Sequence, residues 1–459
     1  MINKNKLHSN KPWKSMVQKN TARKNQSRIN RYCRKAAIVL FWLAVWAGLA
    51  LAVDNKILLA APWETAGELL EMLGEASLYL SVARSLLRIG LGFAAGFAAA
   101  LLLAAAGSRF RLLEDILSPV MTLIKTVPVA SFVVLLLIWW GSSFLAAAVS
   151  FLVVLPNIYI STLEGLKAAD KGLLQMAQVF SVPLWNRFLY IYCPALKPFL
   201  SGSLRVALGM CWKSGVAAEV IGTPDYSVGE GLYMSKIYLN TAGVLAWTAV
   251  IVIVSFLFEK AVLWLFGLFL AWEPSCRRAQ AKASPSSVGA LRMENVEKSY
   301  GGCTVLKDCT ESYEPGGIYY LTSPSGSGKT TRLHMLAGLI KPDGGRILAP
   351  RSVGMVFQED RLCEGYDAVK NVELVTGDRE RAEQALLVLL PPEALHKPCG
   401  QLSGGMKRRV AVVRAVEAES EALLLDEPFT GLDAGTRERV KKYIEDRREG
   451  RTLIVATHI

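Results

Sequence analysis

The sequence has few groups that could form a disulfide framework or a zinc site. No two of its eight cysteines have the CxxC spacing that is typical of zinc ligands. We therefore expect small buried residues or free thiols in a reducing compartment. The cysteines are Cys33, Cys193, Cys211, Cys276, Cys303, Cys309, Cys363 and Cys399.

Charge is also scarce, at 20% of the 459 residues against 52% hydrophobic residues, and it is unevenly distributed. Acidic residues are absent from Met1 to Lys35, a stretch that holds eleven Lys and Arg. Such a tail could bind nucleic acid, but it lacks periodicity and directly precedes an apolar run. We therefore expect no nucleic-acid partner and predict a cytoplasmic flank that touches anionic membrane lipid. No small-residue cleavage site follows the apolar run, which excludes a tidy signal peptide.

Long apolar runs predict an α-helical transmembrane domain with about six spans, the third interrupted by Lys125 and Pro128. An amphipathic, interfacial stretch is expected at 259–272. The acidic segment 54–79 suits an outer loop, and the basic loop 161–196 suits the cytoplasmic side. The N-terminus and everything after the sixth span would then be cytoplasmic. The predicted spans are 36–53, 86–105, 116–140, 144–160, 198–221 and 243–258.

Small and charged residues within these spans suggest two further features, a helix-packing site and a solute path. Gly92 and Gly96 are four residues apart, a spacing that permits close helix packing, although small residues are common in spans in any case. Charges inside a span are costly, so Lys125, Lys213 and Glu219 are candidates for a solute path. An interfacial or snorkelling position explains each of them equally well.

The composition changes twice after the last span. Residues 273–290 are small and polar with two prolines, as expected of a linker. From Leu291 on, the composition is that of an α/β domain. The predicted organisation is therefore a basic tail (1–35), a membrane-spanning domain (36–272), a linker (273–290) and an α/β domain (291–459).

The segment "YYLTSPSGSGKTT" predicts a phosphate loop, because an apolar strand at 318–321 leads through a glycine-rich turn into a helix. Lys329 would reach the outer phosphates, and Thr330 would hold Mg²⁺. Ser323 stands where the usual pattern has a glycine, so the turn requires a negative φ there. A loop that no longer binds nucleotide tightly is the alternative. The predicted phosphate-binding residues are Ser323, Ser325, Gly326, Ser327, Gly328, Lys329, Thr330 and Thr331.

The segment "ALLLDEPFTGLD" predicts a buried strand at 422–425 that ends in two acids. Ligands bind at the carboxyl ends of strands in open α/β sheets. Asp426 would hold Mg²⁺ through water, and Glu427 would orient the attacking water. Two solvated acids at a strand end are the alternative, which a neighbouring phosphate loop makes unfavourable.

The segment "QLSGGMKRRV" places Ser403, Gly404 and Gly405 at a helix start, which suits a second anion site. Together with two acids 24 residues later, it makes 291–459 resemble the ATPase subunit of ABC transporters. The resemblance implies a P-loop ABC ATPase fold that binds ATP and Mg²⁺. It also implies roles for Gln358 (Q-loop, catalysis and metal), Tyr300 (stacking on adenine), Asp433 (D-loop) and His458 (switch histidine at the γ-phosphate). Family members continue beyond that histidine, so the sequence is either truncated or a shortened domain.

The membrane half resembles the permeases of the nitrate, sulfonate and taurine importers over roughly 65–260. The resemblance rests on "SLLRIGLGFAAGFAAALLL", "IKTVPVASFVVLLLIWWG" and "CPALKPFLSGSLRVALGMCWKSGVAAEVIG". Its coupling loop corresponds to "LLQMAQVFSVPLWNRFLYIYCPAL", with Ala177 in the alanine signature, Pro194 at the close and Ser181 in place of a usual glycine. A short helix from this loop is expected to dock beside Gln358. The alternative is an ordinary cytoplasmic helical hairpin.

Together the two resemblances imply an ATP-driven importer in the plasma membrane, and we expect its solute to be small and anionic. It would work as a homodimer with composite ATP sites and with a separate extracytoplasmic solute-binding protein. An ABC exporter or lipid flippase is the first alternative, which the short inner loops and the coupling loop disfavour. A weakly catalytic regulatory ABC protein is the second, and only Ser323 and the early end of the sequence support it.

Overall fold

The computed structural model describes residues 33–271, 291–324 and 326–457. By their internal contacts these residues form two compact units. The first unit contains residues up to Ala100 together with Ser118–Asn157 and Arg205–Leu263. The second contains Leu101–Leu117, Ile158–Leu204 and the residues from Trp264 onward.

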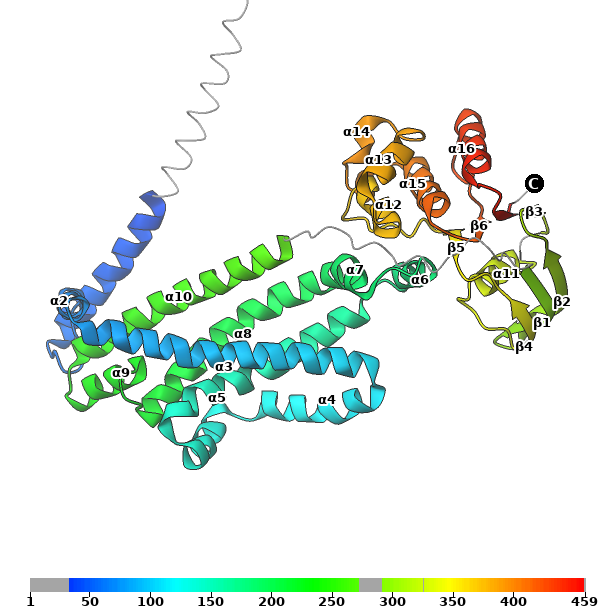
Figure 1. Ribbon diagram of the computed structural model, residues 1–459. Helices are drawn as coiled ribbons and strands as arrows, with labels where there is room; N and C mark the ends of the chain where they lie inside the picture. The colour runs from blue at the N-terminus through cyan, green and yellow to red at the C-terminus, as the bar shows by residue number, and fades with distance from the viewer. Residues whose placement is uncertain (1–32, 272–290, 325, 458–459) are drawn as a thin grey trace, which may run out of the picture. The chain divides into compact units, whose positions relative to one another are not determined.

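Long apolar helices make up the N-terminal part of the chain (Figure 1). Four helices among the described residues are long and apolar enough to cross a membrane: Cys33–Val53, α3, α5 and α10 up to Phe269. Six membrane spans are therefore reached only if α8 and the shorter α4 also cross the membrane. The helices are Cys33–Val53, α2 (Pro62–Gly74), α3 (Ala76–Arg109), α4 (Arg111–Thr126), α5 (Val129–Lys167), α8 (Cys193–Gly222), α9 (Val228–Ile237) and α10 (Thr241–Ala271).

The predicted interruption of the third span is confirmed. α4 ends at Thr126 and α5 begins at Val129, because Pro128 cannot continue a helix and disfavours the helical conformation of Val127. α5 then bends at Gly141, whose backbone (φ 72°, ψ −177°) is not helical. The expected amphipathic stretch at 259–272 continues the helix of the sixth predicted span as far as Ala271, and its interfacial position stays a prediction.

Close packing of α3 against α5 depends on the two glycines that the sequence singled out. A Cβ atom on Gly92 would lie 2.2 Å from the backbone oxygen of Ala147, and one on Gly96 would lie 2.9 Å from that of Phe151. Real Cβ atoms do not approach backbone oxygens this closely. The GFAAG segment is therefore a helix-packing site, as one of the two sequence hypotheses proposed.

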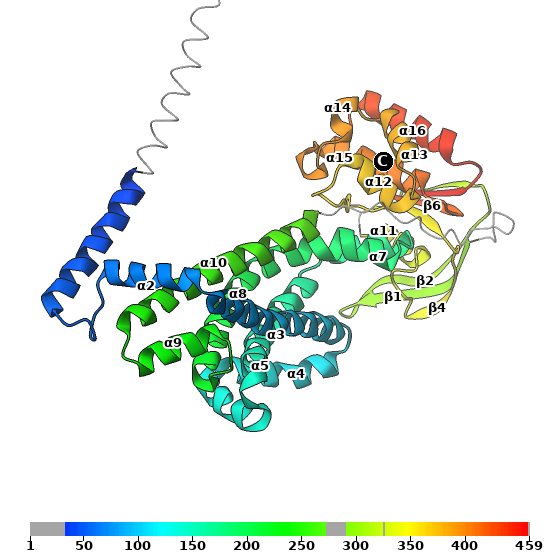
Figure 2. The same cartoon turned by 60° about the vertical axis from the view of Figure 1, so that its left-hand side comes forward.

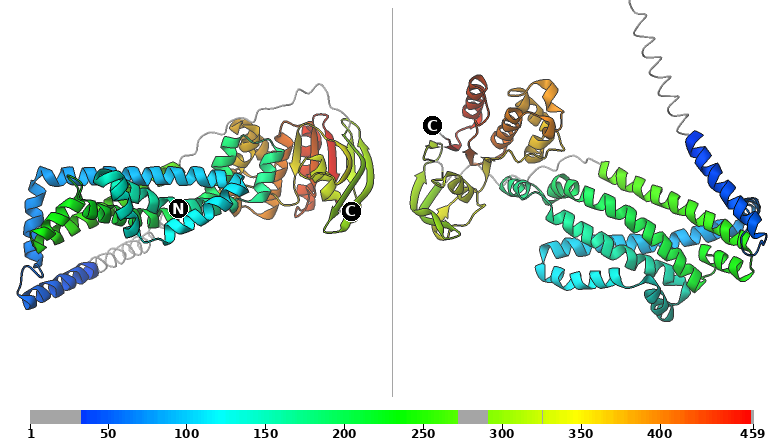
Figure 3. Two further views of the ribbon diagram at one scale, coloured as in Figure 1. Left: turned by 90° about the horizontal axis from the view of Figure 1, so that it is seen from below. Right: turned by 180° about the vertical axis from the view of Figure 1, so that it is seen from behind.

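The second unit holds the nucleotide-binding domain, which is built on two sheets (Figure 2). The antiparallel sheet has the order β2-β1-β4 and forms a curved layer, which is also visible in Figure 3. The parallel sheet has the order β3-β7-β6-β5, and its strands β5, β6 and β7 are entirely buried. The strands are β1 (Leu291–Tyr300), β2 (Cys303–Tyr313), β3 (Ile318–Leu321), β4 (Gly344–Leu348), β5 (Val353–Val356), β6 (Ala422–Asp426) and β7 (Thr452–Ala456).

Helices complete this domain on the flanks of the parallel sheet. They are α11 (Lys329–Leu336), α12 (Ala368–Thr376), α13 (Arg379–Leu387), α14 (Pro392–Leu395), the 3₁₀ turn Cys399–Gln401, α15 (Gly404–Glu417) and α16 (Ala434–Arg447). The predicted strands at 318–321 and 422–425 are confirmed as β3 and β6. β7 lies between them in the sheet.

The predicted coupling segment belongs to the same unit and supplies buried residues to the same apolar core. It consists of α6 (Lys171–Val179), α7 (Leu184–Arg187) and a π-helical turn over Phe188–Tyr192. α6 begins at Asp170, whose carboxylate accepts hydrogen bonds from the backbone N–H groups of Gly172 and Leu173. Ser181 has a φ of 49° after α6 ends. The serine therefore takes the left-handed conformation that a glycine would adopt with less strain.

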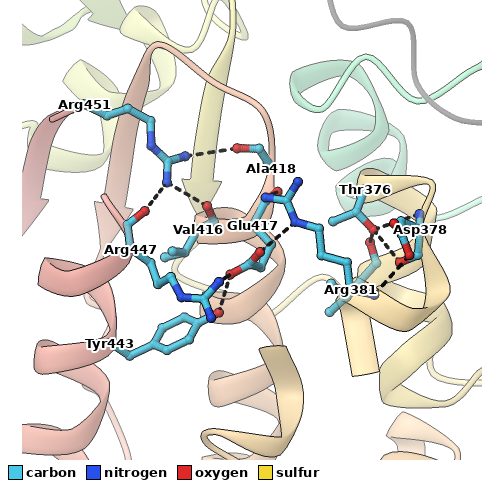
Figure 4. A network of polar contacts seen from close by, with 10 residues as sticks. Thr376, Asp378, Arg381, Val416, Glu417, Ala418, Tyr443, Arg447 and Arg451 are labelled. Carbon is cyan, nitrogen blue, oxygen red and sulfur yellow. Dashed lines mark hydrogen bonds and ion pairs between the residues drawn. The ribbon is translucent and has the colours of Figure 1, made fainter. Parts of the chain in front are cut away.

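A buried carboxylate joins three helices of the nucleotide-binding domain (Figure 4). Glu417, at the end of α15, is 2% exposed. It accepts hydrogen bonds from Arg381 Nε (3.0 Å, α13), Tyr443 Oη (2.7 Å, α16) and Arg447 Nη1 (3.4 Å, α16). Arg451, just before β7, donates to the carbonyl oxygens of Val416 and Ala418. The cluster fixes the end of α15 that lies farthest from the LSGG segment.

We expect Glu417→Gln to lower the free energy of unfolding of this domain by about 2 kcal/mol, because the charged acceptor of two guanidinium groups is lost. Chemical denaturation of the purified protein measures the change. Glu445→Gln on the exposed face of α16 is the matched control and should change stability by less than about 0.5 kcal/mol. Equal effects of the two substitutions would show that the buried cluster contributes nothing specific.

Candidate nucleotide site

The phosphate loop joins β3 to α11 and has two left-handed glycines. Gly326 and Gly328 have φ values of 84° and 83°, and Gly328 caps the start of α11. A Cβ atom on Gly328 would lie 2.8 Å from Leu306, so the space there also requires glycine. Ser323 does not have a positive φ, so the missing first glycine does not prevent the turn. The loop thus turns its chain into a helix N-terminus, the geometry that binds phosphate.

Lys329 is held inside this loop. Its side chain is 7% exposed, and its ammonium donates hydrogen bonds to the carbonyl oxygens of Ser323 and Pro324. The loop therefore wraps around the cation that the sequence predicts to reach the outer phosphates. A phosphate between the loop's N–H groups and this ammonium would be contacted by both.

Asp426 and Glu427 stand at the tip of β6, two strands away from the phosphate loop in the sheet order. Asp426 is 1% exposed, and burial raises the pKa of its carboxyl group, against a hydrogen bond from Thr330 that lowers it. Its Oδ2 atom is buried without a hydrogen-bond partner. Glu427 has a φ of 51°, a strained backbone of the kind found at functional sites.

These residues fit a nucleotide with its magnesium ion. The orphaned Asp426 Oδ2 and the neighbouring Thr330 hydroxyl are hard oxygen donors, which Mg²⁺ prefers. The ion would keep several waters and be completed by phosphate oxygens, so few protein ligands suffice. Consistent with this, the described residues contain no group of three or more His, Cys, Asp or Glu that could hold a metal by themselves.

Arg408, in α15, is a residue of this site that sequence reasoning missed. Its buried guanidinium donates through Nη1 to the carbonyl oxygen of Phe357 (2.7 Å), and through Nη2 to those of Gln358 (3.1 Å) and Glu427 (2.9 Å). It also forms an ion pair with Asp360 at 3.0 Å. One side chain therefore ties the helix that starts at LSGG to the Q-loop and to the end of β6.

Arg414, further along α15, holds the other end of the same loop. It is fully buried and donates to the carbonyl oxygens of Asp360 (2.9 Å) and Arg361 (2.7 Å). Burial lowers the pKa of its guanidinium to about 10. The ring of Phe180, from the coupling segment, lies 5.5 Å from this guanidinium. Two arginines of α15 therefore donate hydrogen bonds to the backbone carbonyl groups of residues 357–361.

We expect Arg408→Lys to destabilise the nucleotide-binding domain by about 2 kcal/mol, because an ammonium cannot reach the three carbonyl oxygens and the Asp360 carboxylate in the same geometry. Thermal or chemical unfolding measures the loss. Arg437→Lys, on the exposed face of α16, serves as the control with no expected change. If the two variants unfold alike, the guanidinium does not brace the site.

The coupling segment packs where the sequence expected it, beside the Q-loop. A Cβ atom on Gly172 of α6 would lie 3.4 Å from Arg361 Nε. Tyr190 is buried, its ring stands edge-on to Tyr366 at 5.1 Å, and Lys370 lies 5.1 Å above it. Ala177 of the alanine signature is fully buried, whereas Pro194 is exposed. An ordinary solvated hairpin does not explain this burial.

The LSGG segment forms a true helix start. Ser403 caps α15 and its hydroxyl accepts a hydrogen bond from the N–H of Met406. Ser403 and Gly404 are exposed, and a Cβ atom on Gly404 would meet nothing within 4 Å. Asp433 caps α16 in the same way, accepting from the N–H of Thr436 at 3.0 Å. The N-terminus of α15 is therefore exposed, and its N–H groups can contact a ligand that is bound outside this domain's core.

Among the described residues, Gln358 and Tyr300 are not brought to the site by any contact of their side chains. Gln358 is exposed and joins the network only through its backbone oxygen. Tyr300 is 46% exposed at the end of β1, with Lys298 Nζ 5.5 Å from its ring. Ser325 and His458 lie outside the described residues, although β7 ends at Ala456 between β3 and β6. The roles of these residues stay predictions.

Comparison with known proteins identifies both halves of the chain. Residues 306–430 match the family model described as ABC transporter, and residues 92–268 match the one described as binding-protein-dependent transport system inner membrane component. Similar proteins include the Fe(3+) ions import ATP-binding protein FbpC of Agrobacterium fabrum, 39% identical over 191 residues, and FbpC 1 of Rhizobium meliloti, 41% identical over 192 residues.

Both alignments cover 37% of this chain and 54% of the relative, so the chain spans about half the length of the curated relatives it matches. A similar solved structure is the dimeric post-hydrolysis state of the ATP-binding cassette MJ0796 bound to ADP and Pi. It is 28% identical, has a TM-score of 0.35, and the match covers 37% of this chain and 88% of that one. The chain therefore carries a permease domain of the binding-protein-dependent transport family fused to an ATPase domain of the ABC transporter family.

Proposed function

We propose that this chain is one half of an ATP-driven importer, with permease and ATPase on one polypeptide, and that two copies form the working unit. The observation that carries the proposal is the match of the membrane half to a binding-protein-dependent permease on the same chain as an ABC ATPase. An exporter or flippase is disfavoured by the same match. The two left-handed glycines of the phosphate loop and the acids at β6 argue against a purely regulatory protein.

In this proposal ATP binds between the phosphate loop of one copy and Ser403, Gly404 and Gly405 of the other. Lys329 and the loop N–H groups hold the phosphates, and Thr330, Asp426 and Gln358 hold Mg²⁺. The ion, when bound, neutralises charge on the transferred phosphoryl group. Glu427 orients the attacking water and His458 contacts the γ-phosphate. ATP binding closes the two ATPase domains, and hydrolysis reopens them.

Closure reaches the membrane half through the coupling segment. Residues 357–361 contact α6 on one side and are held by Arg408 and Arg414 on the other. A change at Glu427 or at the helix start of α15 is therefore transmitted through a short, packed chain of contacts. The N-terminus and the ATPase domain would lie on the cytoplasmic side of the plasma membrane, with the basic tail touching lipid.

The solute is proposed to be a small anion of the nitrate, sulfonate or taurine type, delivered by a separate extracytoplasmic binding protein. The relatives named for Fe(3+) import match only 37% of this chain, over its ATPase half. That half does not contact solute, so their named cargo is a weaker guide than the permease resemblance. Fe(3+) is kept as the competing solute in the test.

The test uses the full chain in lipid nanodiscs and in proteoliposomes that contain a candidate binding protein. We expect Mg²⁺-dependent ATP hydrolysis that the liganded binding protein stimulates, and uptake of a labelled anion such as nitrate or an alkanesulfonate. Stimulation by lipids or hydrophobic compounds alone would support export. Uptake of Fe(3+) without any anion would overturn the solute assignment, and absence of ATP hydrolysis would overturn the function itself.

A further inference from the structure

The sequence singled out three charged residues in the membrane helices, and Lys213 on α8 is the one whose position the described contacts of the first unit do not explain. The depth of α8 is set by its neighbours. Trp212 is 1% exposed and donates to the carbonyl oxygen of Ile251 in α10 at 3.2 Å. A Cβ atom on Gly215 would lie 2.7 Å from Ile89 in α3 and 2.9 Å from Ser150 in α5. Trp212 and Gly215 therefore pack against three helices that qualify as membrane spans.

This level is deep in the hydrocarbon layer. Ile251 is ten residues from Thr241, where the candidate span of α10 begins. At about 1.5 Å per residue that is about 15 Å, or half of a hydrocarbon core of about 30 Å. Lys213 follows Trp212 directly, so it lies at the same depth.

Lys213 points away from these neighbours. It is exposed, and no hydrogen bond or ion pair involves it within the part of the chain that the structure describes. The residues one helical turn before and after it on the same face, Met210 and Ala217, are exposed as well. Gly202 and Gly209 lie near this face, and a Cβ atom on either would meet nothing within 4 Å. No described residue covers this face of α8.

The other two charges that the sequence singled out have local explanations. Glu219 is fully buried and accepts hydrogen bonds from Ser85 Oγ (2.6 Å) and the N–H of Gly229 (3.4 Å), with Arg88 at 3.8 Å. It fixes the start of α9 to α3 and α8. Lys125 lies in the last turn of α4, where a cation is favourable and can reach the interface.

Snorkelling does not account for Lys213. It is nine residues before the end of α8 at Gly222, which is about 13.5 Å along the axis. A four-carbon stem does not span that distance. A lysine that faces lipid at mid-depth costs about 2.5–3.5 kcal/mol. Water on this face removes the cost.

We propose that the exposed face of α8 around Lys213 lines an aqueous solute path, and that the Lys213 ammonium is a binding point for the oxyanion group of the passing solute. On the same face of α8, the exposed positions nearest to Lys213 are Val206, Met210 and Ala217, and none of them is acidic. Its field therefore favours anions over cations. This inference rests on the proposed function and narrows its solute to a small carboxylate, sulfonate or inorganic oxyanion.

The experiment measures the charge of the path without knowing the solute. Ala217→Cys is placed one turn from Lys213, at about 6 Å, in the full chain in membrane vesicles. The introduced thiol is treated with an anionic and a cationic methanethiosulfonate, with Lys213 present and with Lys213→Gln. Mass spectrometry of the peptide that contains position 217 gives the two rates of modification. Val252→Cys, at a position that is 62% exposed on α10, is the matched lipid-facing control.

We expect the thiol of Ala217→Cys to react with both reagents and that of Val252→Cys to react with neither. Lys213→Gln should lower the anionic-to-cationic rate ratio about tenfold, since one unit charge at this distance acts on the two reagents in opposite directions. Lys213→Arg should preserve the ratio. An unreactive thiol at position 217, a thiol at position 252 that reacts as fast, or a ratio unchanged by Lys213→Gln would each overturn the proposal. ATP hydrolysis measured on the same vesicles separates these outcomes from a failure of the ATPase.

Discussion

Replacing Glu427 by glutamine is expected to lower ATP turnover by about 10²–10⁴-fold while nucleotide still binds, because the group that orients and deprotonates the attacking water is lost. The backbone around it should not change. Its N–H donates to the Ala456 oxygen at 2.9 Å, and its carbonyl oxygen accepts from Arg408. A glutamine oxygen can still accept the Thr430 hydroxyl, which now contacts Glu427 Oε2 at 3.1 Å.

The same variant is expected to trap ATP between two copies. In the proposed cycle closure needs bound ATP and opening needs hydrolysis, so Glu427→Gln should accumulate as a closed dimer with ATP and Mg²⁺. Phosphate release measures the turnover, and cross-linking of the two ATPase domains measures the closure. Glu438→Gln, exposed on α16, is the control with wild-type turnover. Turnover within about threefold of the parent in Glu427→Gln would assign the catalytic role to another group.

The parts of this site that could be predicted from sequence are those whose roles are local. A run of apolar residues ending in a turn or an acid located β3 and β6 within one residue, and glycine spacing located the phosphate loop. Pro128 broke a helix as its chemistry requires. These features depend on residues close together in the chain, so a single sequence contains the information.

The buried charged side chains that hold the elements of the site together could not be predicted in the same way. Arg408 sits in "GGMKRRV", where three neighbouring cations resemble a solvated helix face. Its burial depends on carbonyl groups 51 and 19 residues away along the chain. Arg414 and Glu417 likewise find partners only after the sheet is assembled. Helical continuity of α10 beyond Phe258 was missed because an amphipathic stretch can either lie at an interface or extend a span.

Lys329→Ala is expected to weaken ATP binding by about 10²-fold or more, the cost of removing a partner from a desolvated charge pair of about 2–5 kcal/mol. In the structure the ammonium is already inside the loop, on the carbonyl oxygens of Ser323 and Pro324. No reorganisation of this cation is needed when phosphate arrives. The methyl group of alanine cannot replace either contact, so the loop also loses a brace.

Two measurements on Lys329→Ala separate lost binding from lost folding. Without nucleotide, its melting temperature should fall by only a few degrees, as for a change of about 1 kcal/mol. With ATP and Mg²⁺, the stabilisation seen for the parent chain should disappear, because ligand stabilises a fold only in proportion to its occupancy. Lys341→Ala, an exposed lysine soon after α11, should retain that stabilisation in full. If Lys329→Ala is stabilised by ATP as strongly as Lys341→Ala, the loop around Ser323 binds nucleotide without its lysine, and the nucleotide site would have to be assigned elsewhere.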